Sequence, residues 1–434
     1  MAEIEEKHKK YFKSKKMMLF EPSTSVRTTI RRLMVEFGIE SGKQVVAADF
    51  HSALEIIKKD RPDYIFSCFE ANRKNFVELL EAHLEVIPNR LHGGFYVLSE
   101  KNSMAIAAMV LDYDIDAFFS QPITYEAVRN SVLLSLTHKV DMDAYMKSVE
   151  DGKEKFRLAQ YNTAQQMFDY ATTLSKDVSL ANAWLGNTYV RLNKLEEARA
   201  AYRKGLESNN KSYNCIKGLI DLSMQMKRYE DAYTFSKKLI ENYPVNPNKI
   251  ADLVRLSITN HKYEDVVNYC KIFSGLEEKT DAVKKHLAAG LAVCGKYLIA
   301  KQDKENGVNA LMEAAKLSDG KREILYSVIK SLLQVGAKNK AQQVLEEYSN
   351  DQTDAADFSI MELEIVYETE DPGRAFNLGS SLLKKGIKDH RVFEIVIKTS
   401  LSLGRDMGAI ENITFDAIKA HPDKKELFNG LLSK

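Results

Sequence analysis

Residues 185–202 decide the fold of most of the chain. They read Leu185-Gly-Asn-Thr-Tyr189 and, after a short gap, Leu195-Glu-Glu-Ala-Arg-Ala-Ala-Tyr202. The small and aromatic positions of this stretch recur at an interval of 34 residues, together with a turn position that follows them. The recurring positions are Gly152 and Gly186; Ala164, Ala198 and Ala232; Phe168 and Tyr202; Asn210 and Pro244; and Ala341, Ala375 and Ala409. A fixed period of this length indicates stacked helical hairpins, because one hairpin cannot bury its apolar face alone.

This stretch closely resembles the consensus of the tetratricopeptide (TPR) repeat. The resemblance implies an all-α solenoid in which Gly186 and Ala198 let the two helices of a hairpin approach, while Tyr202 fills the space towards the next hairpin. About eight hairpins are expected over residues 145–422, with a capping helix at 423–434. Their expected bounds are 145–178, 179–212, 213–246, 247–280, 281–321, 322–355, 356–389 and 390–422.

Residues 16–140 follow a different pattern, in which short apolar runs alternate with amphipathic stretches. The runs at 16–20, 44–48, 63–68, 94–99 and 116–119 predict buried strands. Helices are expected between and after them, at 26–37, 52–59, 75–84, 104–111 and 125–136. This alternation indicates a parallel sheet covered on both faces, with strand order 2-1-3-4-5 and functional loops at the carboxyl ends of the strands. Residues 1–15 are strongly charged and are expected to form a mobile tail.

The spacing of these elements and two short phrases resemble the receiver domain of response regulators. Arg61-Pro-Asp-Tyr-Ile-Phe-Ser67 is similar to the third strand of that flavodoxin-like family, and Ser120-Gln121-Pro122 is similar to the segment after its fifth strand. The resemblance implies a phosphorylation site at the carboxyl edge of the sheet. The matching positions are Glu21, Pro22, Cys68, Ser99, Phe118 and Gln121.

Three of these positions have lost the groups that phosphorylation requires. Pro22 replaces a metal-binding carboxylate, Cys68 replaces the aspartate that accepts the phosphoryl group, and Gln121 replaces the lysine that contacts it. Because Mg²⁺ prefers hard oxygen ligands, the Cys68 thiol cannot replace the aspartate. The chain is therefore expected to contain a degenerate receiver, or pseudo-receiver. Glu70 as an alternative acceptor and Cys68 as a redox sensor stay open.

The resemblance to TPR arrays also implies a concave wall that holds a peptide. The positions that face inward in the first four hairpins are Lys153, Arg157, Asn187, Arg191, Lys217, Asp221 and Arg255. Basic and amide groups outnumber acids in this set, so it suits an acidic peptide or a chain-terminal carboxylate. Asn187 matches a family position that clamps carboxylates, but the matching lysine of the first repeat is replaced by Val149. The alternative is that these residues are solvated surface charges.

Composition excludes several other classes of protein. The net charge of +1 lacks the basic excess of a nucleic-acid-binding protein. No apolar run is long enough to span a membrane, and the first residues lack an apolar signal core. The four cysteines are scattered, which suits thiols in a reducing compartment. A cytoplasmic protein without metal or other cofactors is therefore expected.

We therefore predict a non-enzymatic scaffold or adaptor that acts through protein–protein contacts. The resemblance implies a bacterial regulatory pathway, such as one for motility, polarity or development. The expected partners are a protein or peptide in the TPR groove, and another protein or a second copy at the face formed by the helix at 104–111, the last strand and the last helix. A receiver protein or a small GTPase fits such a role. The alternatives are a phosphorylatable response regulator with a TPR output and an enzyme whose groups converge within the repeats.

Overall fold

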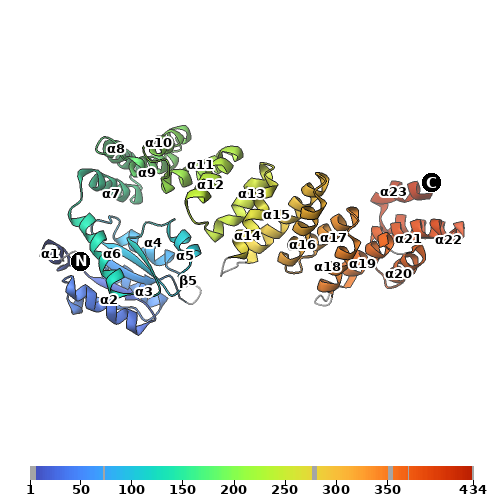
Figure 1. Cartoon of the computed structure of the whole chain (residues 1–434), viewed down its shortest axis with the longest axis horizontal. Coiled ribbons are helices and arrows are strands. Elements are labelled where there is room, and N and C mark those ends of the chain that lie inside the picture. Colours follow the sequence, from blue (N-terminus) through green and yellow to red (C-terminus); the bar gives the residue numbers. More distant parts are fainter. Residues whose placement is uncertain (1–5, 72–73, 276–280, 350–354, 370, 433–434) are drawn as a thin grey trace. The chain divides into compact units, whose positions relative to one another are not determined.

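A computed structural model of the chain describes all residues except 1–5, 72–73, 276–280, 350–354, 370 and 433–434. The described residues form two compact units, 1–249 and 250–434. The first contains a sheet domain followed by three pairs of helices, and the second contains helices (Figure 1).

The sheet domain is built on five parallel strands in the order β2-β1-β3-β6-β7. These strands are β1 (Met17–Phe20), β2 (Gln44–Val46), β3 (Tyr64–Cys68), β6 (Gly94–Ser99) and β7 (Ala117–Ser120). The register pairs Met17 of β1 with Gln44 and Tyr64, and Ser99 of β6 with Ser120. The predicted order 2-1-3-4-5 is thus confirmed. Two further short strands, β4 (Glu70–Ala71) and β5 (Lys74–Asn75), form a separate antiparallel pair.

Helices cover both faces of the sheet. On one face α1 (Glu6–Phe12), α2 (Thr24–Glu36) and α6 (Tyr125–Val140) pack against Leu19, Phe66 and Leu98. On the other face α3 (Phe50–Asp60), α4 (Val77–Val86) and α5 (Met104–Val110) pack against Ile65, Phe95 and neighbouring apolar residues. A short 3-10 helix, η1 (Ser41–Lys43), precedes β2. Because both faces are covered, the central strands are mostly apolar, which is why their sequence contains nearly continuous apolar runs.

The expected mobile tail at residues 1–15 is wrong for its described part. Residues Glu6–Phe12 form α1, and the Phe12 ring is fully buried against Phe37 and Tyr64. Four charged residues dominate this short helix, so its sequence conceals the single aromatic anchor that fixes it. Residues 1–5 lie outside the described part of the chain.

Antiparallel helix pairs follow the sheet domain in the first unit. Each consecutive pair packs together in chain order. The helices are α7 (Ala144–Arg157), α8 (Tyr161–Ala171), α9 (Ser179–Arg191), α10 (Leu195–Ser208), α11 (Tyr213–Gln225) and α12 (Tyr229–Asn242), followed by the short η2 (Pro247–Lys249). The first helix of each pair is followed by a residue in the left-handed backbone region: Ala159, Asn193 and Lys227, with φ of 57°, 59° and 57°. The backbone thus repeats with the 34-residue period of the sequence.

The glycines of these pairs make room for aromatic rings. A Cβ added to Gly186 of α9 would lie 2.5 Å from the Tyr202 ring, and one added to Gly218 of α11 would lie 2.3 Å from the same ring. Gly152 stands in the same relation to Phe168, at 2.6 Å. The aromatic residues of α8 and α10 therefore lie directly against glycine backbones, as the repeat pattern predicts.

The second unit continues as helices. They are α13 (Ile250–Thr259), α14 (Tyr263–Ser274), α15 (Asp281–Ala300), α16 (Lys304–Leu317), α17 (Arg322–Gln334), α18 (Lys338–Ser349), α19 (Ala355–Thr369), α20 (Pro372–Lys384), α21 (His390–Ser402), α22 (Met407–Ala420), η3 (Pro422–Lys424) and α23 (Lys425–Leu432). Consecutive helices again pack as pairs, and Phe428 of α23 is buried against α21 and α22. No described helix is long and apolar enough to cross a membrane.

The fold is thus a five-stranded parallel α/β domain followed by an all-α solenoid of the TPR type, as predicted. The expected division at residues 140–145 stays a prediction, because the sheet domain and the first three helix pairs belong to one compact unit.

Candidate functional sites

The six predicted positions of the degenerate phosphorylation site lie on the strands or loops at the carboxyl edge of the sheet. They are Glu21 after β1, Pro22 beside it, Cys68 at the end of β3, Ser99 at the end of β6, Phe118 within β7, and Gln121 after β7. Parallel strands bring their carboxyl ends to one edge, so the fold places these loops together whatever their chemistry.

Cys68 is a buried thiol. Its residue is 6% exposed, and burial, followed by the negative charge of Glu21, raises the pKa of the thiol to about 12. The protonated thiol is therefore the dominant form at neutral pH. Because the thiolate is the reactive form of cysteine, this environment disfavours the redox role that the sequence left open. Glu70, the alternative acceptor, is exposed in β4.

The remaining polar groups at this edge are held by their own loops. The Glu21 carboxylate accepts a hydrogen bond from Ser23 N–H at 2.9 Å, and burial raises the pKa of Glu21 despite that bond. The Ser99 hydroxyl donates to the Lys101 carbonyl at 2.9 Å, and the Gln121 side chain accepts from Ile123 N–H at 3.3 Å. The Gln121–Pro122 peptide bond is cis. Within the described residues, no group of three or more histidine, cysteine or carboxylate side chains is placed to hold a metal ion.

A second site lies where the loop between α5 and β7 contacts the first repeats. Asp112 of this loop is bound by three side chains from the third helix pair and the segment after it. Tyr213 donates to it at 2.7 Å, the Lys217 ammonium lies at 2.8 Å, and Asn246 donates at 2.8 Å. Two of these donors come from α11, so the acidic loop is fixed on the repeats by charge-assisted hydrogen bonds.

Asp114 makes the equivalent contact with the first helix of the repeats. The Lys153 ammonium of α7 lies 2.9 Å from its carboxylate, and the Arg157 guanidinium donates to the same carboxylate. Lys153 is almost completely buried, and it also contacts Glu150 at 2.6 Å. We call Asp112 and Asp114 the acidic loop pair, and Lys153, Arg157 and Lys217 the basic wall.

The ionisation of the acidic loop pair follows from these contacts. Burial acts to raise the pKa of each carboxyl group, but the basic wall outweighs it. At Asp112, the hydrogen bond from Lys217 is the main cause that lowers the pKa. At Asp114, the positive charges of Lys153 and Arg157 are the main causes that lower it. Both pKa values are therefore lowered, that of Asp114 most strongly. The two aspartates are ionised at neutral pH, and each forms true ion pairs with the wall.

Further hydrogen bonds, each with one charged partner, extend the same interface. The Asn89 amide donates to Asp151 at 3.1 Å and to Glu154 at 2.9 Å, and Arg157 also donates to the Pro88 carbonyl. At the other end α5 contacts η2. The sheet domain thus touches the first and third helix pairs through polar residues on two different loops.

The predicted peptide-groove residues therefore fall into three groups. Lys153, Arg157 and Lys217 are paired with the chain's own acidic loop. Asn187, Arg191 and Asp221 line one cavity of about 360 Å³ beside Trp184. Arg255, in the second unit, is exposed and contacts Asp252 of its own helix. Peptide binding by the whole set stays a prediction. The three residues of the basic wall, however, already form ion pairs with Asp112 and Asp114 of the same chain.

The exposed face expected on the helix at 104–111 is partly correct. Met104 is 71% exposed and Leu111 is 40% exposed. Ala108 lies about one helical turn after Met104 but is only 1% exposed, so the two residues do not share an outward face. The outward side of this helix is narrower than its apolar sequence indicates, because Ile106, Ala108 and Val110 all turn inward.

Sequence reasoning could not find the contact between the acidic loop pair and the basic wall, because these residues lie far apart in the chain. Asp112 and Asp114 stand in a run of three alternating aspartates, Asp112, Asp114 and Asp116, which was the only available hint. An acidic run in a loop is usually a solvated surface feature, so the pattern alone does not indicate a docking element.

Comparison with known proteins adds a general likeness to repeat proteins. No family model matches the chain, and no curated protein matches it. Among solved structures, YrrB, described as a TPR protein with an unusual peptide-binding site, is 16% identical, with a TM-score of 0.31, over 44% of this chain and 95% of that one. A tetratricopeptide repeat protein from Parabacteroides merdae is 14% identical, with a TM-score of 0.31, over 59% of this chain and 98% of that one.

A third similar structure is longer than this chain. It is a signal transduction ATPase with a tetratricopeptide repeat sensor from Pyrococcus horikoshii, 12% identical, with a TM-score of 0.33, and the match covers 92% of this chain and 56% of that one. These similarities are too distant to transfer a site or an activity. The fold described above rests on the sheet order and helix pairs of this chain itself.

Proposed function

We propose that this chain is a non-enzymatic signalling adaptor in the bacterial cytoplasm. Its N-terminal domain is a degenerate receiver that is held on the first repeats by the acidic loop pair. The repeats then present a groove to a protein partner.

The observation that carries this proposal is the seating of Asp112 and Asp114 on the basic wall. By resemblance, the face that contains this loop is the one that phosphorylation rearranges in active receivers. Here the phosphate-acceptor position is the buried Cys68, while the loop is tied to α7 and α11 by ion pairs. In this chain, a permanent contact between the sheet domain and the repeats replaces the contact that phosphorylation controls in active receivers.

The partner site of the proposal is the open part of the repeat wall. The cavity of about 360 Å³ is lined by aromatic side chains, Phe156 and Trp184, and by the polar groups of Asn187, Arg191 and Asp221. Asn187 accepts a hydrogen bond from the Tyr202 hydroxyl at 2.6 Å, so its amide is oriented. An apolar pocket with a few placed polar groups suits a side chain of an extended peptide or a helical motif.

The test is capture of protein partners from native cells with matched variants. Arg191→Glu reverses a charge beside the cavity, whereas Arg203→Glu makes the same change on α10 at an exposed residue that does not line it. We expect one set of proteins to bind the wild type and the Arg203→Glu variant but not Arg191→Glu. If both variants retain the same proteins as the wild type, the cavity is not the partner site.

A further inference from the structure

The parallel strands all begin at one edge of the sheet, which we call the amino edge, and its two halves treat their cations differently. One half contains the starts of β6 and β7, and the other contains the starts of β2, β1 and β3. The first half contacts α7 of the repeats through Asn89 and Asp114. The second half is rich in lysine.

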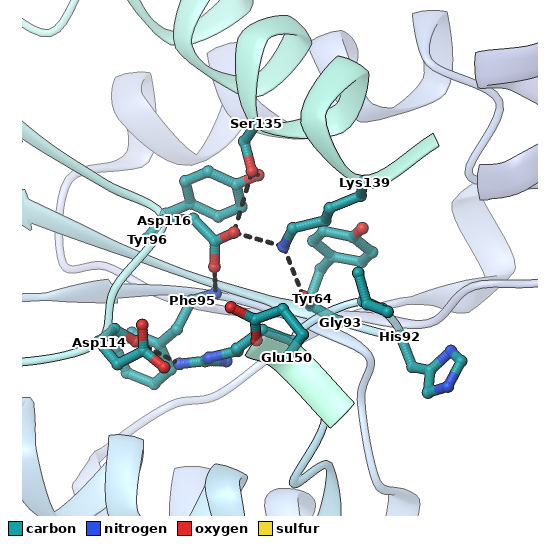
Figure 2. A network of polar contacts seen from close by, with 12 residues as sticks. Tyr64, His92, Gly93, Phe95, Tyr96, Asp114, Asp116, Ser135, Lys139 and Glu150 are labelled. Carbon is teal, nitrogen blue, oxygen red and sulfur yellow. Dashed lines mark hydrogen bonds and ion pairs between the residues drawn. The ribbon is translucent and has the colours of Figure 1, made fainter. Parts of the chain in front are cut away.

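Figure 2 shows that the lysine of the first half is paired inside the fold. Lys139 forms an ion pair with Asp116 and donates to the Gly93 carbonyl at 2.6 Å. Asp116 also accepts from the Ser135 hydroxyl at 2.9 Å and from Phe95 N–H at 2.8 Å. The charge of Lys139 is therefore used to hold β6, β7 and α6 together.

The second half gathers basic side chains from three segments around the start of β1. Lys16 directly precedes β1, and its ammonium group donates to the Asp60 carbonyl at the end of α3, at 3.2 Å. The Lys43 ammonium, before β2, donates to the Lys13 carbonyl after α1, at 2.7 Å. Because β1 pairs with both β2 and β3, these segments lie side by side.

Most of these cations have no carboxylate partner among the residues that the structure describes. Three lysines are paired locally: Lys9 with Glu6, Lys15 with Asp63 and Lys43 with Glu40. The others are exposed and unpaired, and we call them the basic patch: Lys10, Lys13, Lys16, Lys58, Lys59 and Arg61. The net charge of +1 for the whole chain conceals this local excess.

The basic patch is a fixed part of the fold, although half of it lies near the start of the chain. Phe12 of α1 is fully buried, and its ring packs against those of Phe37 and Tyr64. The backbone of α1 also lies close to the end of α2, because a Cβ added to Gly38 would be 3.1 Å from the Lys9 carbonyl. The charges are thus presented together on a preformed surface.

The side chains of the basic patch favour one kind of anionic partner. Five of the six cations are lysines, whose compact ammonium groups act as point charges and lack the planar fork that recognises one carboxylate. The aromatic residues of α1 offer no platform for nucleic-acid bases, because Phe12 is buried and the half-buried Tyr11 donates its hydroxyl to the Leu91 carbonyl. Point charges spread over a broad edge suit phosphates that are also spread over a surface, as on an anionic lipid leaflet.

We propose that the basic patch docks this protein on the surface of an anionic lipid membrane. The ammonium groups contact lipid phosphates and no apolar side chain enters the hydrocarbon, so the attachment is peripheral and electrostatic. The two halves of the amino edge then have separate tasks, because one holds the repeats and the other holds the membrane.

The test is flotation of the full chain with lipid vesicles of two compositions. One set is phosphatidylcholine alone, and in the other about one third of the lipid is phosphatidylglycerol, which is anionic. We expect binding only to the anionic vesicles. That binding should be lost as the salt concentration is raised to about 1 M, where the Debye length is about 3 Å.

The test variant combines Lys10→Gln, Lys13→Gln and Lys59→Gln. Because one lysine near an anionic leaflet strengthens binding roughly fivefold, this variant should bind at least tenfold more weakly than the wild type. The control removes the same charge at exposed lysines of the repeats: Lys176→Gln, Lys204→Gln and Lys211→Gln. It should bind within about twofold of the wild type.

Melting temperatures check that both variants are folded, as expected for changes at exposed side chains. If the test variant does not fold, Lys58→Gln with Lys59→Gln replaces it, because both residues are exposed on α3 and should weaken binding in the same direction.

Three outcomes overturn the proposal. The first is that the wild type does not bind the anionic vesicles at low salt; binding of a DNA duplex under those conditions would assign the basic patch to nucleic acid instead. The second is that the test variant binds the vesicles as tightly as the wild type. The third is an equal loss in the test variant and the control, which would mean that overall charge, and not the basic patch, determines binding.

Discussion

The ammonium group of Lys217 lies 2.8 Å from a carboxylate oxygen of Asp112, and this contact joins α11 of the repeats to the loop that follows α5 of the sheet domain. Asp112 is 12% exposed at its side chain and Lys217 is 31% exposed. The pair is therefore protected from solvent enough to be stronger than an ordinary surface ion pair. Lys217 is predicted from the sequence to bind an acidic group of a partner, and in the structure it binds Asp112 of its own chain.

The first prediction concerns phosphorylation. Because Pro22, Cys68 and Gln121 replace the metal-binding, acceptor and phosphate-contact groups, the chain should take no phosphoryl group from acetyl phosphate, and beryllofluoride should not bind. Intact mass and fluorescence titration check the two statements. A stable phosphoryl adduct that disappears in Glu70→Gln would instead support the response-regulator alternative.

The second prediction concerns packing within the repeats. Gly186→Ala places a methyl group 2.5 Å from the Tyr202 ring, so the ring or the helix must shift. Overpacking of this kind costs about 1–3 kcal/mol, which exceeds the gain of about 1 kcal/mol in helix propensity. Thermal unfolding should show a lower melting temperature for this variant.

Gly42→Ala is the control for that experiment, because nothing lies within 4 Å of its added Cβ and it belongs to the same compact unit. Its melting temperature should match the wild type or rise slightly. Equal melting temperatures for Gly186→Ala and Gly42→Ala would show that the Tyr202 ring does not lie against α9.

The sequence predicted the parts of the fold that repeat or alternate. The strands and the helix pairs come from local periodicity, and their expected ranges agree with the structure to within a few residues at most ends. Helix α1 was not predicted, because Phe12 is its one deeply buried apolar residue and most of its other residues are charged. The contact of Asp112 and Asp114 with the basic wall was not predicted for a different reason. An ion pair between residues far apart in the chain produces no periodic pattern in the sequence. A lysine that is predicted to face inward therefore does not indicate which carboxylate it will contact.

The third prediction concerns the two sides of α5. Met104→Glu should change stability by no more than about 0.5 kcal/mol, because the side chain is 71% exposed. Ala108→Glu should prevent stable folding, because it buries a charge without a partner at a residue that is 1% exposed. Circular dichroism and thermal unfolding check both. Equal tolerance of the two changes would contradict the orientation of this helix.

The fourth prediction concerns pH. The folded pKa values of Asp112 and Asp114 are lowered, so their ion pairs contribute stability that is present above the unfolded value of about 3.9 and is lost as the pH falls through the folded values. The wild type should therefore melt higher than Asp112→Asn with Asp114→Asn at pH 7, and the difference should shrink below about pH 4. A difference that is the same at pH 7 and pH 3 would mean that charge at these residues does not hold the loop.

The most direct test of the docked acidic loop is zero-length carbodiimide crosslinking of the full chain, followed by peptide mass spectrometry. A carbodiimide joins a carboxylate to an amine only where the two are already in contact. The pair Lys7–Asp141, with its atoms 2.5 Å apart within the sheet domain, is the positive control. We predict a crosslink between Asp112 and Lys217, and its loss in Lys217→Gln while the control crosslink remains. If Lys7 and Asp141 become joined but Asp112 and Lys217 do not, the sheet domain is not held on its own repeats and the central claim is wrong.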